Sequence, residues 1–559
     1  MADSCCPVLR NPPVSAGYPS GGKMRHGRRK VWRICCVRTF ILLGKDGMKM
    51  RYALKAEEMK EYDRDTTQRI GIPSLVLMER AALSAVQVFE ELKLEPKRVL
   101  VAAGTGNNGG DGLALGRLLA ERGAKVTFYM EGNPERMTEE TRIQRSILEN
   151  SGFSIQSKFE DGEYDMVIDA LLGIGLSREI TGSLRAAVEQ INLLKEQGAT
   201  VCSLDIPSGI CADDGRVLGC GVCADITVTF AFAKRGHFLY PGREYTGRLF
   251  VRDIGITEKS FVNRKPTAFY YEKGELGGLL PERKRSGNKG TFGKVLLIAG
   301  SRDMCGACIL CGSAVLRAGA GMLKIVTPAC NREIIQQTLP EAMLYTFEGM
   351  PEEEKLQESM DWADVIVAGP GLGMGEASRL MVKRVLEYRR QRAGSLPVVI
   401  DADGLNLIAA DDQLRQMAET AGEGEGMIFT PHPGELMRLL KKDMKTYGGY
   451  QEVRARELAE MFSCTVAAKD ASTLVIQKGR EEIYINISGN DGMATAGSGD
   501  VLAGIIGGLL AQGMKSFEAA GFGVFLHGLA GEEAAGRKGR FGMLAGDIAD
   551  SVAAVTRTD

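Results

Sequence analysis

YINISGNDGMATAGSGDVLAGIIGGLLAQG, residues 484–513, is the stretch around which the rest of the chain can be organised. Its start, with Tyr484, Ile485 and Ile487, alternates as a strand does, and an apolar run of helical character begins at Val501. A Gly- and Ser-rich loop before a helix offers free backbone N–H groups and a favourable dipole to a phosphate. Asp500 lies at the mouth of this loop. Its carboxylate would repel phosphate unless it accepts a proton from a substrate hydroxyl. The alternative is a simple helix cap, because Asp is common there.

The composition is that of a soluble α/β protein. The chain has 559 residues, too many for one core, so two or three domains are expected. Hydrophobic content of 44% and charged content of 25% are ordinary, and 70 glycines indicate many tight turns between strands and helices. A net charge of -1 gives no general attraction to nucleic acid or to an anionic membrane, so neither is predicted as a partner.

Thirteen cysteines raise the question of a disulfide or metal site. Cys220 and Cys223 form one cluster, and Cys305, Cys308 and Cys311 form another. Zinc usually takes four ligands, and neither cluster comes with a clear second pair or a nearby histidine, so small buried thiols are favoured over metal ligands. Without a convincing signal peptide, the thiols are expected to be reduced and the protein cytoplasmic.

Residues 1–47 differ from the rest of the chain. They are basic, contain two pairs of adjacent cysteines and hold three closely placed prolines. Their apolar piece is interrupted by Arg33 and Arg38 and is too short to span a bilayer. We favour a disordered extension, or a start codon placed too early with Met48 or Met50 as the true beginning. An arginine-rich transit peptide is the alternative.

From Tyr52 onward, strands alternate with helices, which implies a parallel sheet with right-handed crossovers. Helices are predicted over 55–65 and 74–92. Three polar clusters fall at the predicted ends of strands, along the edge where open α/β sheets bind ligands. Turn chemistry would explain any one of them, but three on one edge favour a site, and their oxygen donors suit a hard cation. The strands are 98–104, 125–130, one ending at Asp169, one ending at Asp205, and 225–232; the clusters are Asn107, Asn108 and Asp111; Asp169; and Asp205 and Ser208.

A second unit follows a loose, turn-rich region, and we place the boundary near residue 270. Polar signals again follow its strands: Gly-rich 369–373, Asp401 and Asp403, the stretch 432–435, and 469–473. His432 is one of only four histidines, and its place between two prolines beside Glu435 favours a functional role over a structural one. The predicted strands are 291–301, 321–327, 364–369, 396–403, 426–430, 464–469, 472–477 and 482–486.

Several motifs, in order along the chain, resemble one family. GTGNNGGDGLALGRLLAERG, DALLGIGLSRE and LDIPSG resemble the N-terminal epimerase domain of NAD(P)H-hydrate repair enzymes. NKGTFGKVLLIAGS, GPGLG, DADGLN, TPHPGEL, KDAST and TAGSGDVLAG resemble their dehydratase domain. The resemblance implies α/β architecture in two domains: a Rossmann-like three-layer α/β/α sandwich over 48–268 and a ribokinase-like α/β/α domain over 269–559, after the extension 1–47.

The resemblance also implies a bifunctional activity. Hydration damages NADH or NADPH at the nicotinamide ring and gives R and S forms of a 6-hydroxy derivative. The N-terminal domain would interconvert them, and the C-terminal domain would dehydrate the S form with ADP, releasing AMP and phosphate. Hydrated NADH, hydrated NADPH and ADP are the implied partners, K⁺ and Mg²⁺ the implied cofactors, and a homo-oligomer the implied assembly. No Mg²⁺ ligand is assigned.

The site residues that the resemblance implies fall into five groups. Asp500 and Asp205 are the catalytic candidates, although K⁺ alone is an alternative organiser of the epimerase site. The other groups are epimerase substrate contacts (Asn107, Asn108, Gly109, Gly110, Asp111, Gly173, Ile174, Gly175, Leu176, Ser177, Arg178, Glu179 and Asp205), K⁺ ligands (Asn108, Asp169 and Ser208), dehydratase substrate contacts (Ala307, Gly371, His432 and Asp500) and nucleotide contacts (Lys469, Asp470, Ala471, Ser472, Thr473 and Gly499).

Two positions depart from the family's pattern. Asp470 stands where the family usually has Gly, which adds a negative charge near the nucleotide and bears on the choice between ADP and ATP. Asp491 stands where Pro is usual. Two other readings stay open. The GSGD loop also serves small-molecule kinases, and similar N-terminal domains act as binding modules without catalysis.

Overall fold

Two β-sheets organise the described residues, which are 50–159, 162–392, 394–422, 424, 426–443 and 450–557 of a computed structural model. They belong to one unit of the chain, residues 48–559. The predicted extension, 1–47, lies outside the described residues. Strands and helices alternate in both sheets, which confirms the predicted α/β class. Among the described helices, none combines the length and apolar character needed to cross a membrane.

The first sheet has seven strands: β2 (Arg98–Ala103), β3 (Lys125–Met130), β4 (Ile155–Gln156), β5 (Met166–Ala170), β6 (Thr200–Leu204), β7 (Ile226–Phe230) and β9 (Arg248–Arg252). Their order is β4-β3-β2-β5-β6-β7-β9, and every neighbouring pair is parallel.

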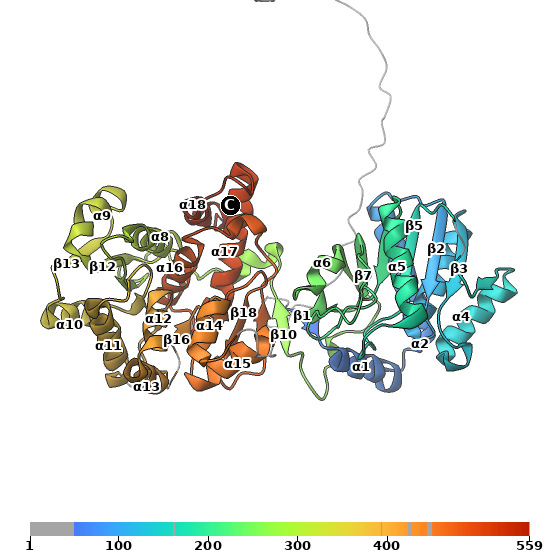
Figure 1. Ribbon diagram of the computed structural model, residues 1–559, viewed down its shortest axis with the longest axis horizontal. Coiled ribbons are helices and arrows are strands. Elements are labelled where there is room, and N and C mark those ends of the chain that lie inside the picture. The colour runs from blue at the N-terminus through green and yellow to red at the C-terminus, as the bar shows by residue number, and fades with distance from the viewer. Residues whose placement is uncertain are drawn as a thin grey trace, which may run out of the picture. The chain divides into compact units, whose positions relative to one another are not determined.

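Helices cover both faces of the first sheet. Successive side chains of a strand point to opposite faces, and here both sets are apolar and need a covering layer. Val99 and Val101 of β2 pack with α2 and α3, whereas Leu100 and Ala102 pack with α5. Figure 1 shows α5 across the strands. The helices here are α1 (Ala56–Asp65), α2 (Ser74–Glu91), α3 (Asn107–Glu121), α4 (Glu139–Asn150), α5 (Gly182–Glu196) and α6 (Gly242–Thr246).

The second sheet has twelve strands: β1 (Arg51–Leu54), β8 (Ala233–Lys234), β10 (Ala268–Tyr270), β11 (Lys294–Ile298), β12 (Met322–Pro328), β13 (Met343–Phe347), β14 (Val365–Ala368), β15 (Val398–Ile400), β16 (Met427–Phe429), β17 (Thr465–Ala468), β18 (Leu474–Gln477) and β19 (Ile483–Ile485). The order is β13-β12-β11-β14-β15-β16-β17-β18-β19-β10-β1-β8. From β13 to β17 all pairs are parallel.

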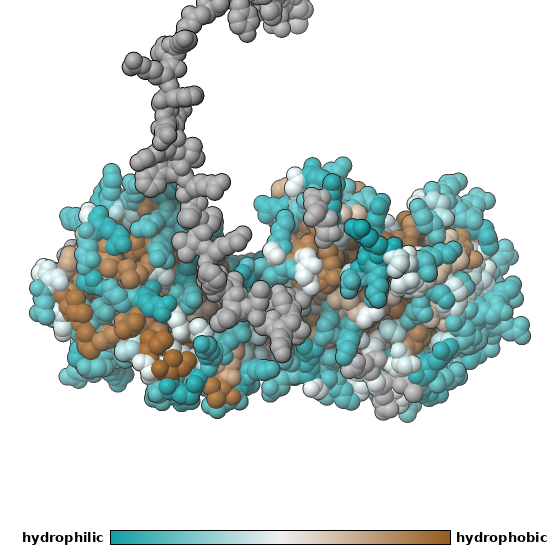
Figure 2. Space-filling view, turned by 180° about the vertical axis from the view of Figure 1, so that it is seen from behind, coloured by the Kyte–Doolittle hydropathy of each residue, from teal (hydrophilic) through white to brown (hydrophobic). Residues whose placement is uncertain are grey.

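Two layers of helices enclose the second sheet (Figure 1). Val295 and Leu297 of β11 pack with α8, α16, α17 and α18, while Leu296 and Ile298 pack with helices of the opposite face. The helices are α7 (Leu276–Leu279), α8 (Cys305–Arg317), α9 (Arg332–Thr338), α10 (Glu353–Trp362), α11 (Glu376–Gln391), α12 (Asp403–Ala410), α13 (Asp412–Ala421), α14 (Pro433–Leu440), α15 (Gln451–Met461), α16 (Ser498–Ala511), α17 (Ser516–Lys538) and α18 (Ala545–Val555). On the face in Figure 2, hydrophilic residues predominate and apolar residues form separate patches.

Three short strands from the first 270 residues extend the second sheet. β10 pairs with β19, β1 pairs with β10, and β8 pairs with β1. The predicted boundary near residue 270 falls at the end of β10. Consequently β8, which follows the last-but-one strand of the first sheet in sequence, is hydrogen-bonded into the second.

The sequence-based limits were wrong at three places near the sites. α3 begins at Asn107, inside the stretch predicted as a loop, and α16 begins at Ser498 rather than Val501. β6 ends at Leu204, so Asp205 follows the strand. The first turns of both helices consist of small polar residues, which carry no apolar periodicity, so the sequence pattern hides where these helices begin. Six short or edge strands were not predicted: β1, β4, β8, β9, β10 and β13.

Candidate active sites

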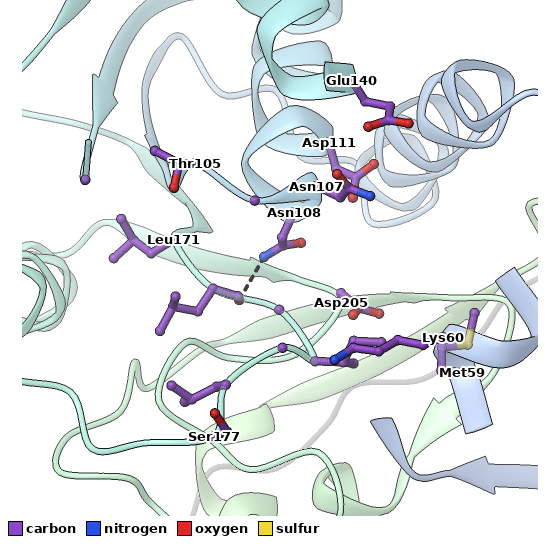
Figure 3. Close-up of a pocket in the computed structure, with 18 of the residues that line it drawn as sticks. Met59, Lys60, Thr105, Asn107, Asn108, Asp111, Glu140, Leu171, Ser177 and Asp205 are labelled. Atoms are coloured by element: carbon purple, nitrogen blue, oxygen red, sulfur yellow. Dashed lines mark hydrogen bonds between the residues drawn. The ribbon is translucent and has the colours of Figure 1, made fainter. Parts of the chain in front are cut away.

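The first candidate site lies where the strand order of the first sheet diverges. β3 and β5 lie on opposite sides of β2, so the segments after β2 and β5 part at the carboxyl edge and leave a crevice. A cavity of about 960 Å³ occupies this edge (Figure 3). Most predicted substrate contacts line it: Asn107, Asn108, Asp111, Gly173, Ile174, Gly175, Leu176, Ser177, Arg178, Glu179 and Asp205.

Gly109 and Gly110 do not line the cavity but allow its wall to form. A Cβ on Gly109 would lie 1.9 Å from the carbonyl oxygen of Gly104. A Cβ on Gly110 would press against Met78 and Thr141. The two glycines therefore let the first turn of α3 pack closely against the end of β2 and its neighbours.

The predicted K⁺ ligands converge on one hydrogen-bonded cluster. Asp169, fully buried, accepts from the Ser203 hydroxyl (2.7 Å), the Ser208 N–H (2.9 Å) and the Ser208 hydroxyl (2.6 Å). Burial raises the pKa of Asp169, and these hydrogen bonds oppose that rise. Asn108 donates to the carbonyl of Leu172 at 2.9 Å, and its Oδ1 is buried without a partner. An unpartnered amide oxygen beside a serine and a carboxylate fits a hard monovalent cation.

Asp205 is held from three directions. Its φ of 62° lies in the left-handed region, which Asp tolerates better than most residues. Its Oδ1 accepts from the Lys234 ammonium and from the Thr229 hydroxyl at 3.2 Å. The Lys234 N–H donates to His237 Nδ1 at 3.0 Å, so the imidazole proton sits on Nε2, 2.9 Å from the Asp205 carbonyl. Burial lowers the pKa of His237 to about 3, which keeps the ring neutral.

Lys234 and His237 were missed by the sequence analysis. Lys234 has no exposed surface, and its ammonium also donates to Thr229 at 2.8 Å and to the Phe230 carbonyl at 3.3 Å. The only signal in the sequence is a Lys placed just after an apolar strand, in FAFAKRGH. That signal is weak, because lysines after strands are usually solvated.

Asp111 brings a second carboxyl group to the same cavity (Figure 3). Burial, aided by the negative charges of Asp205 and Asp63, raises the pKa of Asp111 well above its usual value. Asp63, from α1, also lines the cavity and has a raised pKa, chiefly because of burial. The raised pKa favours the protonated form of Asp111, which makes this carboxyl group a potential proton donor.

The second candidate site is the start of α16. Gly497 has a φ of 90°, and the helix begins at Ser498. In the described part of the chain, no backbone carbonyl accepts from the N–H groups of Gly499 or Asp500, so both remain available to a ligand. Asp500 is the third residue of the helix, not its N-cap, so the capping alternative is wrong. The arrangement matches an anion-binding helix terminus with a carboxylate beside it.

Asp500 has an unusual electrostatic environment. Burial raises its pKa to about 7, and Asp401, Asp403 and Glu435 add to the rise, while Lys469 opposes it. None of the described residues donates a hydrogen bond to its carboxylate. A carboxyl group with a pKa near 7 can both accept and release a proton at neutral pH.

Lys469 lies between the acidic residues. Its ammonium contacts Asp401 at 2.8 Å and Glu435 at 3.9 Å. Asp401 is buried and also accepts from the Thr430 hydroxyl at 2.7 Å. A Cβ on Gly499 would lie 3.1 Å from the Lys469 Nζ, so the lysine reaches the first turn of α16. Its charge is thereby available to a phosphate bound there.

The remaining dehydratase candidates lie around the divergence of the second sheet, between β11 and β14. A Cβ on Gly371 would lie 2.8 Å from the Ala307 Cβ, so these two positions are in contact. Gly373 N–H donates to Asp403 at 2.8 Å. His432 caps α14 by accepting from the Gly434 N–H at 3.0 Å, and its other ring nitrogen lies 3.4 Å from Glu435. His432 thus has a structural role, and half of its side chain stays exposed.

The predicted nucleotide loop, 469–473, connects β17 and β18. Ser472 and Thr473 are buried, whereas Asp470 and Ala471 are exposed. The Asp470 carboxylate accepts from the Ala471 N–H at 2.8 Å. Ser472 donates to the Phe238 carbonyl at 2.5 Å, so its hydroxyl is already engaged.

The two cysteine clusters do not form metal centres in the described part of the chain, where no group of three or more His, Cys, Asp or Glu is placed to hold a metal ion. Cys308 and Cys311 are buried on α8, and burial raises the pKa of both thiols.

Known proteins match both halves of the chain. A family described as NAD(P)H-hydrate dehydratase matches residues 295–553, and one described as YjeF-related protein N-terminus matches residues 74–236. A bifunctional NAD(P)H-hydrate repair enzyme from Moorella thermoacetica is 37% identical over 90% of this chain and 97% of its own length. One from Thermofilum pendens is 34% identical over 88% and 93%. The structure of a ribokinase-like superfamily protein from Enterococcus faecalis is 30% identical, with a TM-score of 0.46, over 52% of this chain and 96% of that one.

These relatives match both halves of the chain in one continuous alignment, with nearly all of their own length covered. The chain therefore belongs to the family of bifunctional NAD(P)H-hydrate repair enzymes.

Proposed function

We propose that the chain restores hydrated NADH and NADPH in two steps. Residues 48–268, the epimerase half, interconvert the R and S hydrates, and residues 269–559, the dehydratase half, convert the S hydrate back to NAD(P)H at the expense of ADP. Membership of the family supports the pair of activities. The observation that carries the dehydratase step is a carboxyl group with a pKa of about 7 beside free N–H groups at the start of α16.

Asp500 acts as the base of the dehydratase step. It accepts the proton of the substrate's ring hydroxyl while that oxygen attacks the terminal phosphoryl group of ADP, and AMP leaves. The N–H groups of Gly499 and Asp500 stabilise negative charge on the transferring group. The ring nitrogen lone pair then expels phosphate, and loss of a ring proton restores the dihydronicotinamide. Phosphorylation is needed because hydroxide is a poor leaving group.

Lys469 neutralises part of the charge that ADP brings. It remains paired with Asp401 while its ammonium faces the first turn of α16. Mg²⁺, when bound, would shield the phosphates of the nucleotide, and such ions are commonly held by phosphates and one or two carboxylates. Among the described residues, no three His, Cys, Asp or Glu side chains are placed to hold a metal ion, so the phosphates would supply most of its ligands.

In the epimerase half, Asn108, Asp169 and Ser208 would hold K⁺, which fits the unpartnered Oδ1 of Asn108. Bound K⁺ would supply a fixed positive charge for the polar part of the substrate. Asp205 accepts a proton at the reacting carbon, and Asp111, whose raised pKa favours its protonated form, lines the same cavity and donates one. Two carboxyl groups in different environments can thus divide the acid and base roles.

A coupled assay tests the proposal. Purified protein is mixed with R and S hydrated NADH, ADP, Mg²⁺ and K⁺, and the return of NADH absorbance is followed. Recovery beyond the S fraction, faster than spontaneous epimerisation, is expected. Recovery limited to the S fraction would make the epimerase half a binding module. No recovery with ADP or ATP would overturn the repair function, and a stable phosphorylated product would favour a small-molecule kinase.

Two replacements in the assay test the proposed roles of K⁺ and of the nucleotide separately. Replacing K⁺ with tetramethylammonium is expected to slow the R-to-S conversion and leave dehydration of the S hydrate unchanged. Replacing ADP with ATP tests the nucleotide preference. We also propose that the protein is cytoplasmic and forms a homo-oligomer, as the family resemblance implies.

A further inference from the structure

A short segment, Ala233–Phe238, connects the two candidate sites; we call it the bridge segment. It begins as β8, the edge strand of the second sheet, and continues into a turn that ends at Phe238. Leu54 of β1 is paired with Lys234 in this strand. The segment belongs to the epimerase half by sequence, but its hydrogen bonds reach residues of both halves.

Lys234 forms the epimerase end of the bridge segment. Its ammonium is completely buried and donates to Asp205, to Thr229 and to the Phe230 carbonyl. These acceptors satisfy its three N–H groups. A buried ammonium has little rotational freedom once all three donors are paired, so the position of the Lys234 backbone determines where the Asp205 carboxylate is held.

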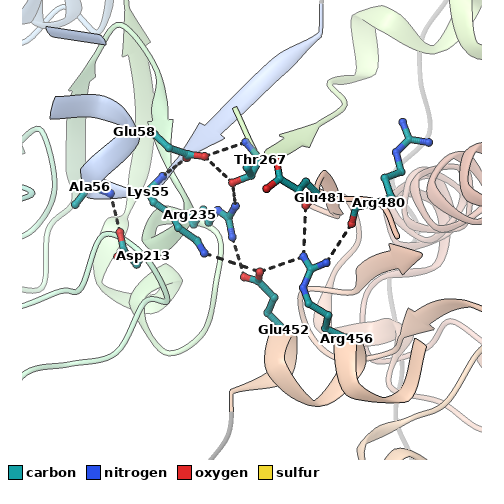
Figure 4. Close-up of polar contacts among 10 residues, drawn as sticks. All are labelled: Lys55, Ala56, Glu58, Asp213, Arg235, Thr267, Glu452, Arg456, Arg480 and Glu481. Atoms are coloured by element: carbon teal, nitrogen blue, oxygen red, sulfur yellow. Dashed lines mark hydrogen bonds and ion pairs between the residues drawn. The ribbon is translucent and has the colours of Figure 1, made fainter. Parts of the chain in front are cut away.

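Arg235 forms the dehydratase end. It is 1% exposed and is the first residue of the short 3-10 turn Arg235–His237 that follows β8. One nitrogen contacts Glu452 of α15 at 2.7 Å, and another donates to the Thr267 hydroxyl at 2.5 Å (Figure 4). Thr267 in turn donates to Glu58, whose other oxygen accepts from the Lys55 N–H at 2.7 Å. Among the described residues, Glu452 is the only carboxylate that contacts Arg235.

The end of the bridge segment is attached to the dehydratase half a second time. Ser472, in the predicted nucleotide loop, donates to the Phe238 carbonyl at 2.5 Å. Phe238 also packs against Tyr270, with ring centroids 4.7 Å apart. The segment is therefore fixed at both Arg235 and Phe238 by residues that lie after the predicted domain boundary.

We propose that the dehydratase half supplies a positioning residue to the epimerase site: Glu452 holds Arg235, and thereby keeps Lys234 on Asp205. The inference rests on the proposed epimerase function. Breaking a buried ion pair on one side leaves an uncompensated charge that must move toward water. Because Arg235 follows Lys234 directly, a movement of Arg235 displaces the ammonium from Asp205, although no residue of the cavity has changed.

The test measures epimerisation alone, in the full-length protein and without nucleotide. Purified S hydrate is the substrate, and appearance of the R form is followed by chromatography. Glu452→Gln is compared with Lys234→Met, with the double variant and with the wild type. Glu457→Gln is the matched control, since Glu457 lies on the same helix but pairs with Lys442 at 2.5 Å. Dehydration of the S hydrate with ADP shows that each preparation is folded.

Glu452→Gln is expected to lower the kcat of epimerisation about tenfold, with KM within about twofold of wild type, because a positioning residue acts on the reacting group rather than on binding. Lys234→Met should lower kcat about 100-fold. The double variant should match Lys234→Met alone, since both changes act through the same ammonium. Glu457→Gln should behave as wild type.

Other results overturn the inference. A folded Glu452→Gln protein that epimerises with the wild-type kcat would overturn it. A double variant whose kcat is lowered by the product of the two single effects would also overturn it. If Glu452→Gln fails to fold, Arg235→Lys is tested instead, because lysine keeps the positive charge but cannot contact Glu452 and Thr267 at the same time. A wild-type kcat of epimerisation in Arg235→Lys would also overturn the inference. A wild-type protein that does not equilibrate the two hydrates removes the epimerase function itself, which is a different outcome.

Discussion

The two carboxylates proposed to be catalytic, Asp205 and Asp500, stand in contrasting surroundings although a lysine lies near each. Lys234 donates directly to Asp205. Lys469 instead contacts Asp401 and Glu435. The pKa of Asp500 is raised to about 7, and none of the described residues donates a hydrogen bond to its carboxylate. The same residue type therefore fixes one carboxylate in place and leaves the other free to exchange a proton.

The contrast follows from the chemistry proposed for each half. A carboxylate that must take a proton from a hydroxyl works best with a pKa close to the ambient pH. A carboxylate that must keep its place beside a reacting carbon gains from a rigid ionic partner. Both sites lie at the diverging strands of a parallel sheet, so the difference comes from the side chains around them and not from the architecture.

The largest expected effect is on Asp500. Asp500→Asn should lower the kcat of dehydration about 1,000-fold, because it removes the base that acts during phosphoryl transfer. Equilibration of R and S hydrates in the same protein should not change. Asp491→Asn is the control, since Asp491 is exposed in the preceding loop and pairs with Arg540 at the surface. Dehydration by Asp500→Asn within tenfold of wild type would assign the base elsewhere.

Asp205→Asn should lower the rate of epimerisation about 100-fold. Asn also adopts the left-handed backbone found at this position, so the fold around it should persist. The assay follows conversion of S to R hydrate without nucleotide, and dehydration of the S hydrate serves as the internal control. A normal rate of epimerisation would remove Asp205 from the mechanism and leave K⁺ as the organiser of the site.

The pH dependence of dehydration should reveal the raised pKa of Asp500. Only the ionised carboxylate accepts a proton, so kcat should fall tenfold per pH unit below a midpoint of about 7 or higher. Bound phosphate would move the midpoint upward, because negative charge favours the protonated carboxyl group. In Asp403→Asn the midpoint should move downward, since one negative charge near Asp500 is gone. A flat profile between pH 5.5 and 8 would contradict the assignment.

The smallest effect is expected at Asp470, which is exposed in the nucleotide loop. Asp470→Gly removes a negative charge near bound phosphates and should lower the KM for ADP about two- to threefold, since exposed charges interact weakly in water. Titrating ADP and ATP against both proteins measures the change and shows whether Asp470 favours one nucleotide. An unchanged KM for both nucleotides would mean that its side chain, bonded to the Ala471 N–H, faces away from the phosphates.

Much of the first site was predictable because its residues belong to short sequence motifs that follow recognisable strands. Asn107, Asn108 and Asp111 sit directly after β2, and Asp205 directly after β6, so the order of strands alone brings them to one edge. Lys234 was not predictable, because its pairing with Asp205 joins residues 29 positions apart through a strand that leaves the first sheet for the second.

In the second site, too, some features could be predicted from the sequence and others could not. The loop before α16 and the carboxylate of Asp500 follow from a Gly- and Ser-rich sequence ahead of an apolar run. The limits of α16 did not follow, because small residues in its first turn show no periodicity. Asp500 is not a cap because α16 begins at Ser498. Its raised pKa depends on burial first, and then on Asp401, Asp403 and Glu435, which other segments of the chain bring close.

By itself, the sequence determined the α/β class, the order of the motifs and the residues that face the sheet edges, since each depends on neighbours along the chain. Only the tertiary structure decided the partners of the charged groups: Lys234 with Asp205, Lys469 with Asp401, and Arg235 with Glu452. The physical reason is that an ion pair inside a protein depends on which distant backbones approach and how completely they exclude water, and neither quantity is written in a local pattern.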